Sequence, residues 1–155
     1  THYGNVITED IDIELDLAGI GHLVALTPND EVNTLAATRF REIFGGGRVF
    51  QLPPAPLPAG IESHAAEQFG GRSLFDGELH YGRLRRAIER GAEIRATRLG
   101  GAFDAAAYRA EHGESAIPLF VRRESGRLTV VTEEDSGVLQ DAADGDVVIS
   151  LIPGD

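Results

Sequence analysis

The residues best placed to bind a ligand lie next to a short apolar run near the start of the chain. Residues 22–27 are almost continuously apolar, and Thr27, Asn29 and Asp30 connect this run to an amphipathic stretch. In open α/β sheets, ligands bind outside the carboxyl ends of the strands, where helices begin. Hydroxyl and amide groups there hydrogen-bond a ribose or a phosphate, but the same side chains also cap helices. Both interpretations stay open at the level of the sequence.

No other group of side chains has the spacing expected of a catalytic or metal site. The histidines are scattered, and none lies at the i, i+4 spacing of a helical metal pair. They are His2, His22, His64, His80 and His112. The carboxylates of residues 9–14 lack the glycine and final glutamate of a calcium loop, so a solvated helix face is favoured. We therefore expect no catalytic residue and no bound metal.

The composition argues against several classes of function. With 25 acidic and 14 basic residues, the 155-residue chain has a net charge of −11. This charge repels phosphate backbones, so we expect no nucleic acid partner. The chain has no cysteine for a disulfide, and no stretch approaches the ~20 consecutive apolar residues of a membrane helix. No signal peptide is recognisable, and because no methionine begins the chain we expect a piece of a longer protein.

The acidic segment at the start of the chain has two interpretations. Ile11, Leu15 and Ala18 lie at i, i+4 and i+7, which predicts a helix over residues 9–19. The carboxylates near its start and Gly19 at its end suit the two helix termini. The alternation of isoleucine and leucine in the same segment also permits a strand.

The elements that must position the candidate loop form a βαβ unit. Apolar runs at residues 22–27 and 49–52 predict two buried strands. Between them, residues 31–44 have the periodicity of a helix, which the glycines at 45–47 terminate. The predicted apolar stripe of this helix consists of Val32, Leu35, Ala36, Phe40, Ile43 and Phe44. The order strand, helix, strand predicts that the two strands are parallel.

The remainder of the chain begins with a proline-rich segment. Four prolines within residues 53–58 exclude helix and central strand, and a short helix around residues 62–68 remains an alternative beyond them. Helices are then predicted over residues 78–90 and 104–112. Asp104 caps the second of them. Phe103 and Tyr108 occupy the positions of a hydrophobic staple across that cap. Strands are predicted at residues 93–99, 118–123, 127–132 and 146–152, and Ser125 and Gly126 predict a hairpin turn between the second and the third of them.

The motifs of the first part resemble those of a known regulatory domain. They comprise Tyr3-Gly4-Asn5, then Leu15 with Ala18-Gly19-Ile20, and then residues 23–33 with Thr-x-x-Asp-x-x-Asn spacing. This pattern is similar to the later half of the TrkA-N domain, also called the KTN or regulator-of-potassium-conductance domain. Residues 40–45, Phe-Arg-Glu-Ile-Phe-Gly, are similar to bacterial sodium/proton antiporters that carry such a cytosolic tail.

The second part looks like the small TrkA-C domain that often accompanies TrkA-N. The similar segments are residues 117–121, residues 126–131 and the Gly145-Asp146 pair before the final strand. The resemblance implies an α/β chain in which residues 1–52 form the second half of a Rossmann-like parallel sheet. Residues 53–70 are then a proline-rich linker, and residues 71–155 a small α+β domain.

The resemblance also implies where a nucleotide would lie. Carried over by motif, Asn5 faces the adenine, where the family has an aspartate, and Thr27 lies near the ribose or the phosphates. Asn29 and Asp30 complete the predicted cofactor-binding set. The family's glycine-rich phosphate loop precedes the matched region. The parent domain is therefore expected to bind NAD or an adenine nucleotide, and this fragment to bind it weakly or not at all.

Together these features predict a non-catalytic, cytosolic regulatory region of a bacterial sodium or potassium/proton antiporter. Its expected partners are the transmembrane antiporter domain of the same chain and further copies of itself, since a half sheet leaves an edge and an apolar face uncovered. Its expected location is the cytoplasmic side of the bacterial inner membrane. The alternatives are a fragment of a Rossmann-type NAD-dependent oxidoreductase and a stand-alone oligomerisation module.

Overall fold

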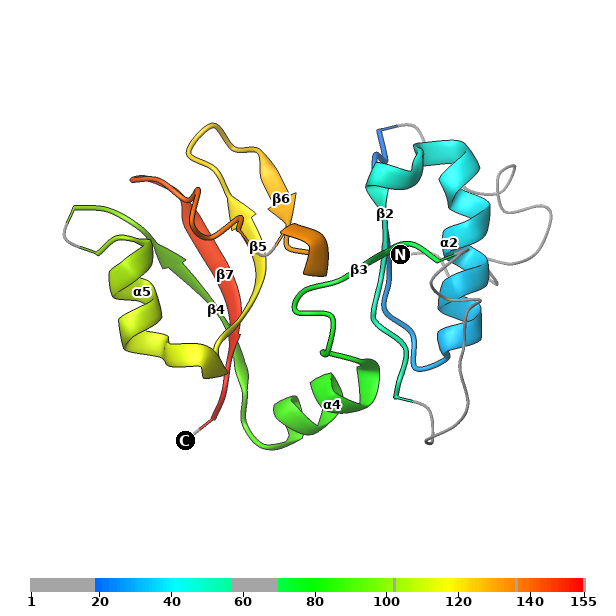
Figure 1. The fold of residues 1–155 in the computed structure, drawn as a ribbon, viewed down its shortest axis with the longest axis horizontal. Coiled ribbons are helices and arrows are strands. Elements are labelled where there is room, and N and C mark those ends of the chain that lie inside the picture. Colours follow the sequence, from blue (N-terminus) through cyan, green and yellow to red (C-terminus); the bar gives the residue numbers. More distant parts are fainter. Residues whose placement is uncertain (1–18, 57–69, 102, 136, 155) are drawn as a thin grey trace. The chain divides into compact units, whose positions relative to one another are not determined.

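The computed structural model describes residues 19–56, 70–101, 103–135 and 137–154 (Figure 1). The chain divides into two compact units, Thr1–Arg72 and Ser73–Asp155. Apart from Gly19, the segment predicted as a helix at 9–19 lies outside the described residues, as do the Tyr3-Gly4-Asn5 motif and residues 62–68. Residues 53–56 continue from the first sheet without regular secondary structure.

The first unit is built on the predicted βαβ arrangement. Strand β1 (Leu23–Ala25) leads into helix α2 (Asp30–Phe44), and strand β2 (Val49–Gln51) follows the helix. Leu23 of β1 pairs with Val49 of β2 and the two strands are parallel, as predicted. A two-residue strand, β3 (Arg72–Ser73), lies beside β2 and gives the sheet the order β1-β2-β3.

Helix α2 has the ends that its sequence predicts. Asn29 is the N-cap, and its Oδ1 accepts a hydrogen bond from Val32 N at 3.1 Å. Gly45 ends the helix with φ of +80°, a conformation that glycine adopts without steric cost. The Gly45 N–H donates to the Arg41 carbonyl and satisfies one of the last free acceptors of the helix.

The predicted apolar stripe of α2 is partly wrong. The buried residues of the helix are Asn33, Ala36, Ala37 and Phe40, whereas Leu35 is 53% exposed and Ile43 is 43% exposed. Ala37 and Phe40 form a core cluster with Val49 of β2. The buried face therefore runs through positions 33, 37 and 40, and it includes a polar residue, Asn33, that its residue type alone assigns to the surface.

The second unit contains an antiparallel sheet of four strands in the order β4-β7-β5-β6 (Figure 1). The strands are β4 (Glu93–Arg98), β5 (Ile117–Arg122), β6 (Leu128–Val130) and β7 (Val147–Ile152). Their positions confirm the predicted strands to within two residues at each end. The predicted turn between β5 and β6 is also present, and Gly126 occupies it with φ of +86°.

Two helices accompany this sheet, α4 (Tyr81–Glu89) and α5 (Ala105–His112). Helix α5 begins as predicted, because Asp104 Oδ1 accepts hydrogen bonds from Ala106 N and Ala107 N, both at 2.9 Å. A core cluster joins α5 to the sheet through Leu99, Tyr108 and Val148, with Phe103 packed against it.

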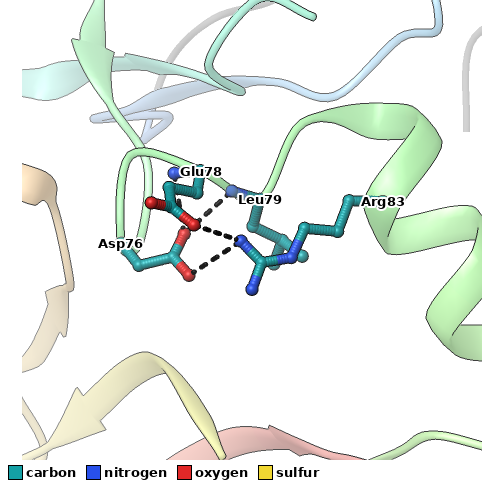
Figure 2. Close-up of polar contacts among 4 residues, drawn as sticks. All are labelled: Asp76, Glu78, Leu79 and Arg83. Carbon is teal, nitrogen blue, oxygen red and sulfur yellow. Dashed lines mark hydrogen bonds and ion pairs between the residues drawn. The ribbon is translucent and has the colours of Figure 1, made fainter. Parts of the chain in front are cut away.

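Helix α4 begins three residues later than predicted. Asp76 Oδ1 accepts hydrogen bonds from Glu78 N and Leu79 N, so this segment forms a turn in place of the first helical turn (Figure 2). Arg83 of α4 closes the turn with ion pairs to Glu78 Oε2 at 2.9 Å and to Asp76 Oδ2 at 3.6 Å.

The end of β7 lies close against the connection between α4 and β4. A Cβ atom at Gly154 would lie 2.7 Å from the Arg90 carbonyl oxygen and 2.8 Å from the Gly91 carbonyl carbon. Gly91 itself has φ of +89°. Glycine is required at position 154 because any side chain there would collide with backbone atoms.

The chain is thus a mixed α/β protein with a small sheet in the first unit and a separate antiparallel sheet in the second. Within the described residues, each helix is too short or too polar to cross a membrane.

Candidate functional site

The candidate loop between β1 and α2 is held by the buried side chain of Asn33. This asparagine is only 1% exposed. Its Oδ1 accepts hydrogen bonds from Thr27 N at 3.0 Å and from Thr27 Oγ1 at 2.7 Å. Its Nδ2 donates to the Thr27 carbonyl at 2.9 Å. A single amide side chain therefore binds the backbone donor, the backbone acceptor and the hydroxyl of Thr27.

Asn29 has a capping role in this loop. Besides accepting from Val32 N, it donates its own N–H to Thr27 Oγ1 at 3.3 Å. The hydroxyl of Thr27 is thereby bound to both Asn29 and Asn33. The sequence offers these polar groups as ligands of a ribose or a phosphate, but in the structure they form hydrogen bonds within the loop.

Asp30 connects the start of α2 to the segment after β2. Its Oδ2 accepts a hydrogen bond from Ala55 N at 3.0 Å. Asp30 and Glu31 are the acidic residues of the first helical turn. Carboxylates at this end stabilise the helix dipole and oppose the approach of a phosphate to the same amides.

The structure brings three of the four predicted cofactor-binding residues together. Thr27, Asn29 and Asp30 lie in one loop at the carboxyl end of β1, and Asn5 lies outside the described residues. Asn33 was part of the Thr-x-x-Asp-x-x-Asn spacing but was not predicted as a site residue. The sequence does carry a signal for the burial of Asn33, because this residue lies at i, i+4, i+7 spacing with the buried Ala37 and Phe40.

A second polar cluster lies in the second unit around Asp146, which is 3% exposed. Asp146 Oδ2 accepts from Arg123 Nη1 at 2.8 Å and from Ala143 N at 2.9 Å, and its Oδ1 accepts from Glu124 N at 3.0 Å. Burial alone would raise the pKa of Asp146, but these hydrogen bonds and the charge of Arg123 together lower it below its ordinary value.

An open cavity of about 560 Å³ lies beside this cluster. It is lined by Arg98, Leu99, Gly100, Glu124, Asp144 and Gly145. Asp144 Oδ1 accepts a hydrogen bond from Gly101 N at 3.1 Å, so this carboxylate supports the loop after β4. In the part of the chain that the structure describes, no three His, Asp or Glu side chains gather closely enough to hold a metal ion.

A buried tyrosine completes the polar interior of the second unit. Tyr108 is 2% exposed, and its hydroxyl donates to Ser150 Oγ of β7 at 2.6 Å. Burial raises the pKa of Tyr108, and the hydrogen bond with Ser150 opposes that shift. This pair fixes α5 on the sheet through one hydrogen bond inside an apolar cluster.

Comparison with known proteins adds no assignment. No family model matches the chain, and no curated protein matches it.

Proposed function

We propose that this chain is a cytosolic regulatory region of a bacterial monovalent-cation/proton antiporter, carrying sodium or potassium, and that it has no catalytic activity of its own. The observation that carries this proposal is the loop after β1. Thr27, Asp30 and Asn33 have the spacing of the TrkA-N motif, and Asn33 joins Thr27 to the start of α2 by three hydrogen bonds. The parallel β1-α2-β2 unit around the loop supports the same proposal.

The proposed mechanism is a shift of population in the attached transporter. A regulatory region changes the activity of a transporter when it binds an effector or a partner more tightly in one state than in the other. Such a region acts from the cytoplasmic side of the inner membrane and needs the transmembrane domain as its covalent partner. Self-association of copies then couples the states of neighbouring transporters.

Nucleotide binding is assigned to the parent domain and not to these residues. The Thr27 hydroxyl and the Asn29 side chain already take part in hydrogen bonds within the loop, and Asp30 and Glu31 place negative charge at the start of α2. NAD or an adenine nucleotide would need the glycine-rich loop of the preceding half for its phosphates. Isothermal calorimetry of this chain with NAD, ATP and ADP should give no binding heat, and a micromolar Kd would contradict this assignment.

A stand-alone oligomerisation module is the second candidate. Helix α4 has no buried residue, and Ile88 and Ile94 are more than half exposed in the second unit. In an oligomerisation module, these two isoleucines would offer apolar contacts to another copy. This candidate keeps a binding role but requires no transporter.

The test that separates the two is transport by the whole protein. The gene upstream of Thr1 should encode a series of apolar segments of ~20 residues each. Sodium- and potassium-driven proton exchange would be measured in everted vesicles, with and without residues 1–155. We expect exchange to persist without this region, and its dependence on cation concentration to change. A dehydrogenase domain upstream would refute the antiporter proposal.

A further inference from the structure

A second cavity in the second unit, of about 390 Å³, lies between the end of α5 and the start of β5 (Figure 1). Its lining comes from three parts of the chain. Tyr108 belongs to α5, Pro118 belongs to β5, and Leu139 belongs to the segment that precedes β7. Gly113, which ends α5, also borders the cavity and adds no side chain to it. A volume of this size is typical of sites that bind small molecules.

The apolar part of the lining is anchored in the core of the unit. Tyr108 is 2% exposed, and Leu139 packs against the core cluster to which Tyr108 belongs. The hydrogen bond from the Tyr108 hydroxyl to Ser150 Oγ holds the ring in place. Ala116 and Pro118 are half-buried and add apolar surface. The cavity therefore has an apolar surface that exists before any ligand binds.

Two polar side chains of the lining have no partner within the described part of the chain. Arg109 forms no ion pair there, and the side-chain amide of Gln140 forms no hydrogen bond. Both residues are exposed, and they approach the cavity from different segments. A guanidinium donates two parallel hydrogen bonds to a carboxylate, and a glutamine amide can donate another. The cavity thus combines apolar surface with donors for a carboxylate.

The charges around the cavity favour an anion at this place. Arg109 is the only charged residue in the described lining. The carbonyl end of α5 has partial negative charge, but Arg109 and His112 lie in its last turn and offset that charge. The carboxylates nearest in sequence to Arg109 and Gln140 are Glu111 and Asp141, which are exposed and lie outside the described lining. The net charge of the whole chain is screened beyond about 8 Å at physiological salt.

We infer that this cavity is a binding site for a small aromatic carboxylate. The ring of the ligand would contact Leu139, Pro118 and the buried ring of Tyr108. Its carboxylate would accept hydrogen bonds from Arg109 and Gln140. A guanidinium also stacks on aromatic faces, so the same arginine favours a ring over an extended chain. A compact ring with one carboxylate matches both the volume and the polarity of the lining.

The larger cavity of about 560 Å³ in the same unit lacks this combination. Besides Leu99 and two glycines, its lining consists of the charged residues Arg98, Glu124 and Asp144. Leu99 is only 1% exposed and offers little apolar surface to a ligand. Charged groups in such a place are well solvated by water, and an aromatic ring would remove that water without replacing its hydrogen bonds. This cavity therefore provides an internal comparison for the binding experiment.

The experiment is a titration of the full chain, labelled with ¹⁵N, with 2-naphthoate and with its neutral analogue 2-naphthamide. In proton–nitrogen correlation spectra, 2-naphthoate should shift the amide signals of Gly113, Leu139 and Gln140. A ligand of this size should bind with a Kd of about 1 mM or below. The amide should bind roughly fivefold more weakly, because it lacks the charge that Arg109 recognises. The signal of Gly145, beside the larger cavity, should not move.

Variants of the chain test the two parts of the site. Arg109→Gln should weaken 2-naphthoate binding roughly tenfold and leave 2-naphthamide binding unchanged. Arg127→Gln is the matched control, since it removes the same charge from an exposed residue beside the turn between β5 and β6. It should bind like the original chain. Ala116→Leu should weaken the binding of both probes, because the larger side chain occupies part of the cavity.

Several results would overturn the inference. One is the absence of any shift at about 10 mM probe, which is well above a Kd of 1 mM. Shifts confined to other parts of the chain would exclude this cavity as the site. Equal affinity for the two probes, or unchanged binding by Arg109→Gln, would remove the role of the carboxylate. Circular dichroism melting verifies that each variant is folded. None of these measurements involves transport, so the inference stands or fails separately from the proposed function.

Discussion

Asn33 takes a position on the buried face of α2 that an apolar residue would normally occupy. Its amide replaces the water that would solvate Thr27 in an open loop, and both polar atoms of the amide are used. A buried polar group costs little free energy when it is fully hydrogen-bonded and much more when it is not. The side chain therefore fixes the entry to α2 only as long as its geometry is preserved.

Replacing Asn33 by leucine should destabilise the first unit by about 1–3 kcal/mol, because the donor and acceptor groups of Thr27 lose their buried partner. Urea unfolding followed by circular dichroism measures the change. Asn29→Ser is the control, since serine also caps helices and should alter stability by only a few tenths of a kcal/mol. Equal stability of Asn33→Leu and the original chain would show that the amide has no structural role.

At the scale of elements, local chemistry makes most helix and strand positions predictable. Asn29 and Gly45 delimit α2, and Asp104 begins α5, because capping depends on a few neighbouring residues. The start of α4 was not predictable in this way. Asp76 accepts two backbone hydrogen bonds, and the resulting turn replaces the first helical turn. The Asp76-Gly77 pair is a turn signal, but it does not show how many residues of the predicted helix the turn replaces.

The buried face of α2 and the hydrogen bonds of the candidate site were also not fully predictable from the sequence. Leu35 and Ile43 fit an apolar stripe as well as Ala37 does, and only packing against Val49 decides between them. The grouping of Thr27, Asn29 and Asp30 was predictable, since all three follow one strand. Their hydrogen bonds were not, because these bonds depend on the buried orientation of Asn33.

The turn before β7 should make the second unit sensitive to acid. The pKa of Asp146 is lower in the folded chain than in the unfolded chain. The stabilisation from its ionised form is thus present above the unfolded pKa of about 3.9 and is lost as the pH falls through the folded value. Thermal melting between neutral and strongly acidic pH should show this loss in the original chain.

The variant Asp146→Asn should be less stable at neutral pH and should lose part of the acid dependence. It keeps the shape of the side chain but not the charge that pairs with Arg123 at 2.8 Å. Asp141→Asn is the matched control, since it makes the same charge change at an exposed position nearby. If both variants retain the acid dependence of the original chain, Asp146 is not its source.

At the scale of the whole molecule, the first unit leaves apolar side chains open to water. Leu35 and Ile43 on α2 are both more than two-fifths exposed, and so is Leu26 after β1. Residues eight apart on a helix are separated by about 80° around its axis, so Leu35 and Ile43 lie on one side of α2 with Arg39 between them. A face of this kind favours association with another chain.

Sedimentation velocity should therefore find a dimer or a larger species at micromolar concentration. The double variant Leu35→Glu and Ile43→Glu should shift the population toward monomer, because it replaces both exposed apolar side chains of α2 with charged ones. Ile94→Lys in the second unit serves as the control and should leave the association unchanged. A monomeric original chain would rule out this role for α2.

The contact between Gly154 and the Arg90–Gly91 backbone has a practical consequence for anyone who produces this protein. The last strand leaves the second unit beside the Arg90–Gly91 backbone, so a purification tag fused at this end of the chain would extend from a tightly packed part of the unit. Reporter groups and tags therefore belong at the amino end, remote in sequence from β4.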